Sequence, residues 1–249
     1  MRISWLTNIG RERVRNEDSC FAVSDGKKAL LVVADGMGGH KAGNVASSLA
    51  VATAENFWQN IDGRELPDRE KTRQMVKDFI YEANGLILAE AAGSSTRKGM
   101  GTTITAVLLS GRQIIIGHVG DSRAYLINNN KIRLLTKDHS LIEQLIASGE
   151  IKPEDAINHP QRHILTRALG VERNPEVDIL EMEVDKGAAI LLCTDGLTNL
   201  VNDQEILAVS TTVSEPQLLA EKLIEMANDR GGHDNITVVI ASGIGGPKD

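Results

Sequence analysis

Two stretches of the chain place apolar residues three and four positions apart, which is the spacing of an amphipathic helix. Both are long and rich in alanine, and they carry Lys and Glu on their polar faces. Three shorter segments share the pattern, and the first of them begins with a serine suited to be its N-cap. The predicted helices cover Ala42–Trp58, Asp68–Ala92, Ser140–Ser148, Asp203–Val209 and Glu215–Asn228.

Short apolar runs bounded by turn residues predict strands between these helices. One hairpin signal is Ser24-Asp25-Gly26-Lys27, and Asn128–Asn130 predicts another turn. The predicted strands cover Ser19–Val23, Ala29–Ala34, Thr102–Leu109, Gln113–Val119, Arg123–Ile127, Val177–Glu183, Ala188–Cys193 and Asn235–Ala241. Strands in antiparallel succession, with helices in pairs, favour an α+β layered fold over a parallel βαβ sheet.

No internal repeat or inter-domain linker interrupts the pattern, so residues 1–249 are expected to form a single domain. Residues 149–170 contain two prolines and several polar breaks, and they predict a long surface excursion. An apolar content of 41 % is enough for a sizeable core and excludes a disordered chain.

Charge and cysteine content narrow the class of protein. The formal charge is −7, which disfavours binding to nucleic acid or to an anionic membrane. No apolar run approaches the ~18 residues of a membrane span, and no signal peptide is recognisable at the amino terminus. Only two cysteines occur, so a disulfide scaffold is excluded and a cytoplasmic location is expected.

Acidic residues stand at the ends of several apolar strands. Asp35-Gly36 and Asp195-Gly196 each follow an apolar run, Asp121 repeats the pattern, Asp234 comes just before a run, and Glu17-Asp18 precedes a strand. Any one of them could simply cap a turn. Several carboxylates converging at a sheet edge would repel one another and so require a cation. Oxygen ligands favour Mg²⁺ or Mn²⁺, and a pair of such ions can activate a water and clamp a phosphoryl group.

Six sequence blocks, in order along nearly the whole chain, carry a resemblance to one family. They are Arg13-Val14-Arg15-Asn16-Glu17-Asp18, Asp35-Gly36-Met37-Gly38-Gly39-His40, Gly120-Asp121-Ser122-Arg123-Ala124-Tyr125, Thr136-Lys137-Asp138-His139-Ser140, Thr194-Asp195-Gly196-Leu197 and Asp234-Asn235-Ile236-Thr237. The chain resembles the metal-dependent protein phosphatases of type 2C, and most of all the bacterial members with one domain.

The resemblance implies a four-layer αββα sandwich, in which two central antiparallel sheets are flanked by helix pairs. It also implies hydrolysis of phosphoserine and phosphothreonine in proteins by direct attack of a water that bridges two Mn²⁺ or Mg²⁺ ions. The excursion over residues 149–170 would be a flap beside the active site.

The resemblance also implies roles for individual residues. Asp35 would bridge the two ions, the Gly36 carbonyl would bind one of them, and Asp195 and Asp234 would bind the other. Asp121 would join Asp195 at a third, weaker ion.

Three further positions match the family's motifs. Asp18 would orient the attacking water, with Glu17 just outside it. Arg13 would contact the substrate phosphate, which suits its planar fork of donors.

Two departures from the family's pattern lie near the site. Met37 stands where eukaryotic relatives have a histidine, which leaves His40 as the nearest candidate for a catalytic general acid. Asn44 and Asn199 stand where many relatives carry an acid. These are read as changes around the site that leave the metal ligands in place.

Two other functions stay open at this point. The chain could be a phosphoprotein-binding module of the same fold with weak catalysis, although the intact Asp35, Asp195 and Asp234 argue against this. It could also be a two-metal phosphoesterase on small phosphoesters. For a protein phosphatase, the expected partners are phosphorylated proteins and, by family, a Hanks-type Ser/Thr kinase with its targets; the chain itself is expected to be a monomer.

Overall fold

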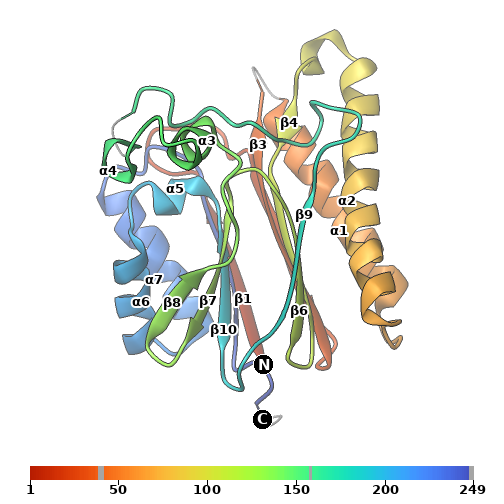
Figure 1. The fold of residues 1–249 in the computed structure, drawn as a ribbon, viewed down its shortest axis with the longest axis vertical. Coiled ribbons are helices and arrows are strands. Elements are labelled where there is room, and N and C mark those ends of the chain that lie inside the picture. The colour runs from red at the N-terminus through yellow and green to blue at the C-terminus, as the bar shows by residue number, and fades with distance from the viewer. Residues whose placement is uncertain (39–41, 157–158, 247–249) are drawn as a thin grey trace.

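Two antiparallel β-sheets lie face to face at the centre of the molecule, and helices cover the outer face of each sheet (Figure 1). This computed structural model describes residues 1–38, 42–156 and 159–246. The first sheet has the strand order β1 (Arg2–Asn8), β11 (Ile236–Ser242), β10 (Ala189–Cys193), β7 (Arg123–Asn128) and β8 (Lys131–Leu134). The second has β2 (Asp18–Ser24), β3 (Lys28–Met37), β5 (Ile104–Ser110), β6 (Gln113–Val119) and β9 (Asp178–Glu183), and the short β4 (Gly101–Thr102) pairs with β3.

Each sheet is covered by one pair of long helices. The second sheet packs against α1 (Gly43–Ile61) and α2 (Arg69–Ala92), and the first packs against α6 (Asp203–Thr212) and α7 (Pro216–Asp229). Shorter helices gather at the upper end in Figure 1, namely η1 (Ser95–Arg97), α3 (Leu141–Ala147), α4 (Pro153–Ala156) and α5 (Asp195–Thr198). The expected α+β architecture of four layers is therefore confirmed.

Strand β3 shows why its sequence is a continuous apolar run. Its side chains alternate between two buried faces, as the period of two in a strand requires. Leu30 and Val32 pack against the helices α1 and α2, whereas Leu31 and Val33 pack against the opposite sheet. The run ends at Asp35, where the strand leaves the core.

Local signals in the sequence account for the caps and turns of these elements. The Asp68 side chain accepts a hydrogen bond from the Lys71 amide (2.9 Å) at the start of α2, and Ser140 accepts one from the Glu143 amide (3.2 Å) at the start of α3. The predicted hairpin between β2 and β3 is confirmed, with Gly26 at φ +85°.

Two strands were not predicted. Strands β1 and β8 each lie at an edge of the first sheet; exposed and partly buried side chains are mixed along β1, and β8 has only four residues. The predicted strand Thr102–Leu109 is divided at Thr103 into β4 and β5. Among the described residues, no helix combines the length and the apolar character needed to cross a membrane.

Candidate active site

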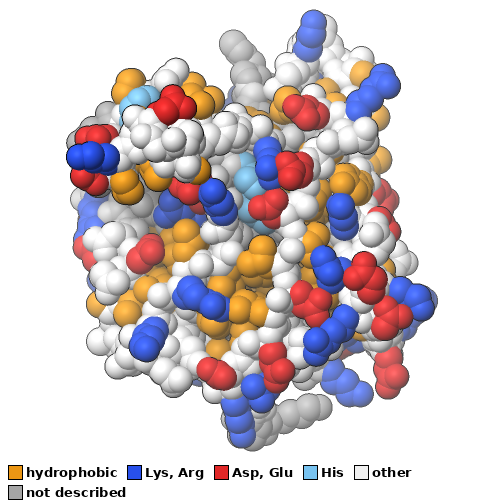
Figure 2. Space-filling model, in the orientation of Figure 1, with side chains coloured by type: hydrophobic (Ala, Val, Ile, Leu, Met, Phe, Trp, Pro, Cys, Tyr) orange, Lys and Arg blue, Asp and Glu red, His pale blue; other side chains and the backbone are white. Residues whose placement is uncertain are grey.

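The strand ends that carry the predicted carboxylates meet at the upper end of the sandwich in Figure 1. They surround a cavity of about 1150 Å³ whose lining includes Asp35, Asp121, Asp195 and Asp234. Arg13 also lines this cavity. Figure 2 shows histidine side chains on the upper half of this face, together with acidic and basic side chains, and further acidic and basic side chains on its lower half. The structure therefore brings together four acidic residues that are up to two hundred positions apart in the sequence.

Asp18 lies buried beside this cavity, directly opposite Asp35 in the pairing of β2 with β3. Its Oδ2 accepts hydrogen bonds from the hydroxyls of Thr194 (2.8 Å) and Thr237 (2.7 Å). Its Oδ1 is buried and has no hydrogen-bond partner within the described part of the chain. Burial, together with the nearby acids Asp195 and Asp234, raises the pKa of Asp18 to about 7, although the two hydroxyls oppose the change.

The backbone of Asp35 is fixed by two threonines at the start of the neighbouring strand. Its amide donates to the Thr103 hydroxyl (2.9 Å), and its carbonyl accepts from the Thr103 amide (2.9 Å) and the Thr102 hydroxyl (2.8 Å). Burial raises the pKa of Asp35 well above its usual value, and the charge of Asp18 raises it further. The backbone that carries the carboxylate is thus fixed, and the carboxylate lies in a place where negative charge is unfavourable.

Gly36 is required by close backbone contacts. A Cβ atom at this position would lie 2.2 Å from the carbonyl oxygen of Gly43 and 2.6 Å from that of Glu17. The Gly36 amide donates to the Glu17 carbonyl (3.1 Å). The start of α1, the residue before β2 and the end of β3 can approach this closely only because Gly36 has no side chain.

Asp195 is the first residue of α5, directly beyond β10. Its Oδ2 accepts a hydrogen bond from the Asn199 amide group (3.0 Å), and its Oδ1 is a second buried oxygen without a partner among the described residues. Burial raises its pKa, and Asp234 raises it further. Asp121 lies in the turn between β6 and β7, where burial and then Asp195 raise its pKa to about 8.

These side chains fit a pair of hard divalent cations. The donors are all oxygen, the carboxylates raise one another's pKa, and two of their oxygens are buried without partners. Among the described residues, no group of three or more His, Cys, Asp or Glu side chains is already arranged to hold a metal ion. Mg²⁺ and Mn²⁺ suit carboxylates and carbonyls, and Mg²⁺ usually keeps several waters, so a complete protein cage is not needed.

Arg13 stands at the mouth of the cavity on an exposed loop. Its Nη2 lies 2.7 Å from Oδ2 of Asp234, and its side chain is 55 % exposed. The hydrogen bond with Asp234 raises its pKa, although burial opposes this. The loop is held by Asn235, whose Nδ2 donates to the carbonyls of Ile9 (2.9 Å) and Arg15 (2.8 Å) and whose Oδ1 accepts from the Glu17 amide (2.8 Å).

Glu17 is half-buried beside the start of α1, where a Cβ atom at Gly43 would lie 2.6 Å from its Oε2. Burial raises the pKa of Glu17. Met37 lines the cavity. His40, the predicted general acid, lies outside the described residues.

Sequence reasoning assigned no role to the uncharged residues that hold the carboxylates. Thr194, Thr237 and Asn235 are neighbours of predicted acids, and each stood in a family block. Their closeness in sequence to those acids was the signal that could have identified them as part of the site. Thr103 carried no such signal, because it reaches Asp35 only through the pairing of strands.

Comparison with known proteins agrees with this geometry. A family model described as protein phosphatase 2C matches residues 10–229. The serine/threonine phosphatase stp of Listeria innocua is 42% identical over 245 residues, which are 96% of this chain and 95% of that protein. The structure of the S. agalactiae serine/threonine phosphatase superposes with a TM-score of 0.87 at 36% identity, covering 97% of this chain and 99% of the other.

A further solved structure is the catalytic domain of the serine/threonine protein phosphatase PstP in complex with two manganese ions. Its TM-score is 0.83 at 36% identity, with 97% of both chains covered. The present chain belongs to the protein phosphatase 2C family.

Proposed function

We propose that this chain is a metal-dependent phosphatase that hydrolyses phosphoserine and phosphothreonine in proteins. The observation that carries the proposal is the group of carboxylates around one cavity: the pKa values of Asp18, Asp35, Asp121 and Asp195 are raised, and two carboxylate oxygens are buried without partners among the described residues. Such a group is stable in its ionised form only with cations present. Relatives at this level of identity are serine/threonine phosphatases by name.

Asp35 and the Gly36 carbonyl would hold one Mn²⁺ or Mg²⁺ ion, and Asp35, Asp195 and Asp234 would hold a second. A third, weaker ion would lie between Asp121 and Asp195. When bound, such ions supply an activated water and neutralise charge on the phosphoryl oxygens.

The remaining residues of the site would orient the reactants. Asp18 has one oxygen fixed by two hydroxyls, so its free Oδ1 can accept a hydrogen bond from the attacking water. Arg13 would exchange its contact with Asp234 for the substrate phosphate, which can accept two parallel hydrogen bonds from a guanidinium. As the phosphorus–oxygen bond breaks, the serine or threonine oxygen takes up a proton, for which His40 stays the predicted donor.

We further propose that residues 1–249 form one catalytic domain in which residues 149–170 act as a flap. In support, the Leu141 amide donates to the Ile164 carbonyl (2.8 Å), and the Thr166 amide donates to the His139 carbonyl (2.8 Å). His163, Leu165 and Thr166 also line the cavity. This segment therefore borders the place where a phosphorylated polypeptide would enter.

The substrates would be proteins phosphorylated by a Hanks-type Ser/Thr kinase, since that chemistry supplies phosphoserine and phosphothreonine. A cytoplasmic location fits two unpaired cysteines, of which Cys193 is buried and Cys20 half-buried. Burial raises the pKa of the Cys20 thiol to about 12, so Cys20 is protonated at neutral pH.

A metal-titrated assay on a phosphothreonine peptide tests the proposal. We expect EDTA to abolish turnover and Mn²⁺ or Mg²⁺ to restore it. Asp35→Asn should lower turnover by at least ~10³-fold, because a charge that the ions require is lost. The matched control is Asp25→Asn, which changes a carboxylate in the β2–β3 turn, far along the same hairpin. Full activity of the chelated enzyme, or near-normal turnover of Asp35→Asn, would refute the proposal.

A further inference from the structure

A buried asparagine in the outer helix layer is bonded entirely to one wall of the cavity. Asn84 lies in the middle of α2, is 1 % exposed, and has the fully buried Ile80, Ala83 and Ile87 as helix neighbours. Its Nδ2 donates to the carbonyls of Glu172 (2.8 Å) and Arg173 (3.3 Å). Its Oδ1 accepts from the Gly170 amide (2.8 Å). Both donor hydrogens of the Asn84 amide and its oxygen therefore form hydrogen bonds with a segment that lies 86 to 89 residues later in the sequence.

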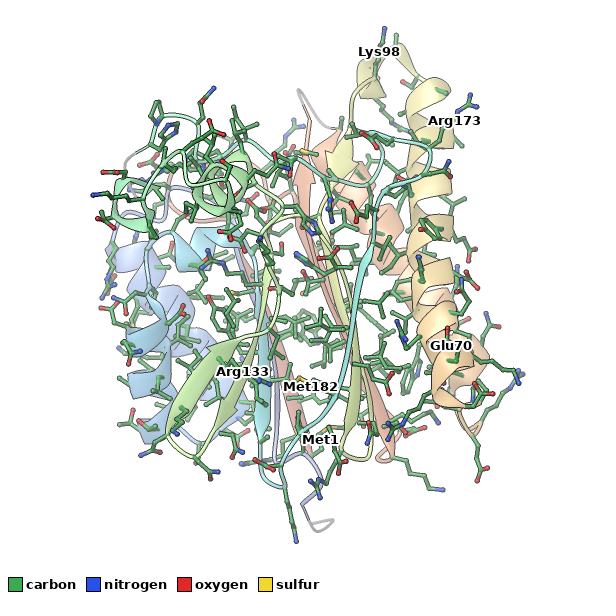
Figure 3. The ribbon with its side chains drawn as sticks, in the orientation of Figure 1. Met1, Glu70, Lys98, Arg133, Arg173 and Met182 are labelled. Atoms are coloured by element: carbon green, nitrogen blue, oxygen red, sulfur yellow. The ribbon has the colours of Figure 1, made fainter. Side chains whose placement is uncertain are left out.

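The segment Leu169–Arg173 is pressed against α2 as well as bonded to it. Gly170 has φ +84°, and a Cβ atom there would lie 2.4 Å from Cγ2 of Ile87 and 2.7 Å from the Met100 carbonyl oxygen. Only glycine allows this approach with that backbone conformation. Figure 3 shows Arg173, at the end of the segment, beside α2.

The same segment begins next to the carboxylates. Leu169 and Thr102 exchange two backbone hydrogen bonds (3.1 and 2.9 Å), and the Thr102 hydroxyl donates to the Asp35 carbonyl (2.8 Å). The chain then leads away from Asp35 along the cavity, which Val171, Glu172 and Pro175 line. Val171 is 60 % exposed, so the segment offers an apolar side chain to whatever enters the cavity.

An ion-pair network fixes the chain beyond this segment. Nη2 of Arg167 lies 2.6 Å from Oε2 of Glu176, and its Nη1 lies 2.9 Å from Oδ1 of Asp178. Residues 169–176 are therefore anchored at one side by Asn84 and at the other by Arg167. Between these anchors they form a wall with no helix or strand of its own.

We propose that Asn84 is a positioning residue that docks Leu169–Arg173 on α2 and thereby shapes a wall that contacts the substrate polypeptide beside its phosphorylated residue. The inference rests on the proposed phosphatase function and deepens it. The phosphate itself would be bound by Arg13 and by the ions that the carboxylates hold, whereas the wall lies farther along the cavity. A docked wall binds a polypeptide without having to be ordered first, which lowers the entropic cost of binding.

The inference predicts that a change at Asn84 affects a phosphopeptide substrate more than a small phosphate ester. In Asn84→Ala, the Gly170 amide and the Glu172 carbonyl lose their side-chain partner, and the wall loosens. We expect kcat/KM for a phosphothreonine peptide to fall about tenfold, mainly through KM, because the loosened wall loses contacts that bind the peptide equally in the ground state and the transition state. For p-nitrophenyl phosphate, which has no polypeptide, the fall should stay within about threefold by the same argument.

The matched control lies on the same helix. Thr72 is 4 % exposed and donates its hydroxyl to the carbonyls of Pro67 and Asp68 at the start of α2, away from the cavity. Thr72→Val should lower Tm without changing the ratio of the two activities. Val171→Ser leaves the buried anchors untouched and should raise KM for the peptide alone.

Each outcome decides one of the two hypotheses. If Asn84→Ala lowers both activities equally, or leaves the peptide activity intact, Asn84 is a structural residue and the inference is wrong. The wild-type protein tests the proposed function separately. If it hydrolyses p-nitrophenyl phosphate but no phosphopeptide, the protein phosphatase assignment fails, and the inference falls with it.

Discussion

At the scale of single residues, two aspartates of one hairpin show how surroundings decide the chemistry of a carboxylate. Asp25 lies in the β2–β3 turn, where partial burial acts to raise its pKa but hydrogen bonds from the Lys28 side chain and from backbone amides lower it to about 2. Asp18 begins the same hairpin, has no such cation, and has a pKa raised by burial to about 7. A carboxylate like Asp25 is already neutralised by a lysine, whereas buried carboxylates like Asp18 can ionise readily only when a metal ion is nearby.

Arg13 yields a prediction that separates substrate binding from metal binding. Arg13→Ala removes a charge-assisted contact to the substrate phosphate, so kcat/KM for the phosphopeptide should fall by roughly 10–150-fold. The midpoint of Mn²⁺ activation should stay unchanged or tighten, because Asp234 loses its competing cation. Arg11→Ala, which removes a neighbouring exposed arginine paired with Asp229, is the control. Weakened Mn²⁺ binding with a normal KM would instead make Arg13 a support of Asp234.

The sequence predicted the acidic residues of the site better than the residues that hold them. A carboxylate at the end of an apolar strand is conspicuous because burying its charge is costly. Thr194 and Thr237 are ordinary strand-flanking residues until the pairing of β10 with β11 brings both hydroxyls to Asp18. Such contacts depend on the pairing of strands that are far apart in the sequence, which neither strand shows on its own.

At the scale of elements, the turn between β6 and β7 is held from one side by a histidine. The His139 amide donates to the Gly120 carbonyl (2.7 Å), and its Nδ1 accepts from the Gly120 amide (3.0 Å). With Nδ1 as acceptor, Nε2 carries the proton and donates to Asp178 (3.2 Å). Gly120 has φ +112°, and the turn places Asp121 beside Asp195.

The position of Asp121 in this turn, beside Asp195, predicts how Asp121→Ala changes metal binding and activity. If Asp121 helps to hold only a third ion, the variant should lose the low-affinity phase of metal activation and keep two tight sites in calorimetry. Activity on the phosphopeptide should fall about tenfold, because a misplaced reactant costs rate through geometry. Asp62→Ala, at the end of α1, is the control. Loss of a tight site would place Asp121 in the main pair, and intact stoichiometry with lower stability would make it a turn cap.

Elements with two buried faces or a strong helical stripe were predicted from the sequence. The edge strands β2 and β9 of the second sheet were also predicted, whereas the edge strands β1 and β8 of the first sheet were not. Helix α2 was predicted within one residue because its apolar spacing and its cap at Asp68 agree. Strand β1 has Arg2 and Ser4 facing α7, and Trp5 is half exposed at the sheet edge. Its identity as a strand comes from pairing with β11, the last strand of the chain.

At the scale of the whole molecule, the sandwich gathers charge at one end. The strands β3, β5, β6, β10 and β11 are buried along nearly their whole length, and five carboxylates from both sheets lie at or just beyond the strand ends that meet at one end of the sandwich. The layers are held by apolar packing, which does not depend on the site. The repulsion among the carboxylates is therefore a cost that the core tolerates and that bound cations relieve.

The repulsion among the buried carboxylates predicts that the metal-free protein becomes less stable as the pH rises through neutrality. Asp18 and Asp121 have folded-state pKa values of about 7 and about 8, above the ordinary 3.8, so between these values the folded chain binds more protons than the unfolded chain. Stability then falls as pH rises. His118 acts in the opposite sense, because burial lowers its pKa to about 4 from 6.5. Half of the unfolded-state histidine is already neutral at pH 6.5, so little of its effect remains above that pH.

The prediction is therefore tested between pH 6.5 and 8.5, where the titration of Asp18 and Asp121 outweighs the small remaining contribution of His118. In EDTA, we expect Tm to fall by at least about 5 °C across this window. A hundredfold excess of Mn²⁺ over its dissociation constant should add about 2.7 kcal/mol and remove the slope, because the ionised carboxylates become ligands. Asp121→Asn should flatten the EDTA curve by removing one titrating group. A Tm in EDTA that stays level or rises with pH would mean that the carboxylates are already ionised without a metal, and the electrostatic demand for cations would be absent.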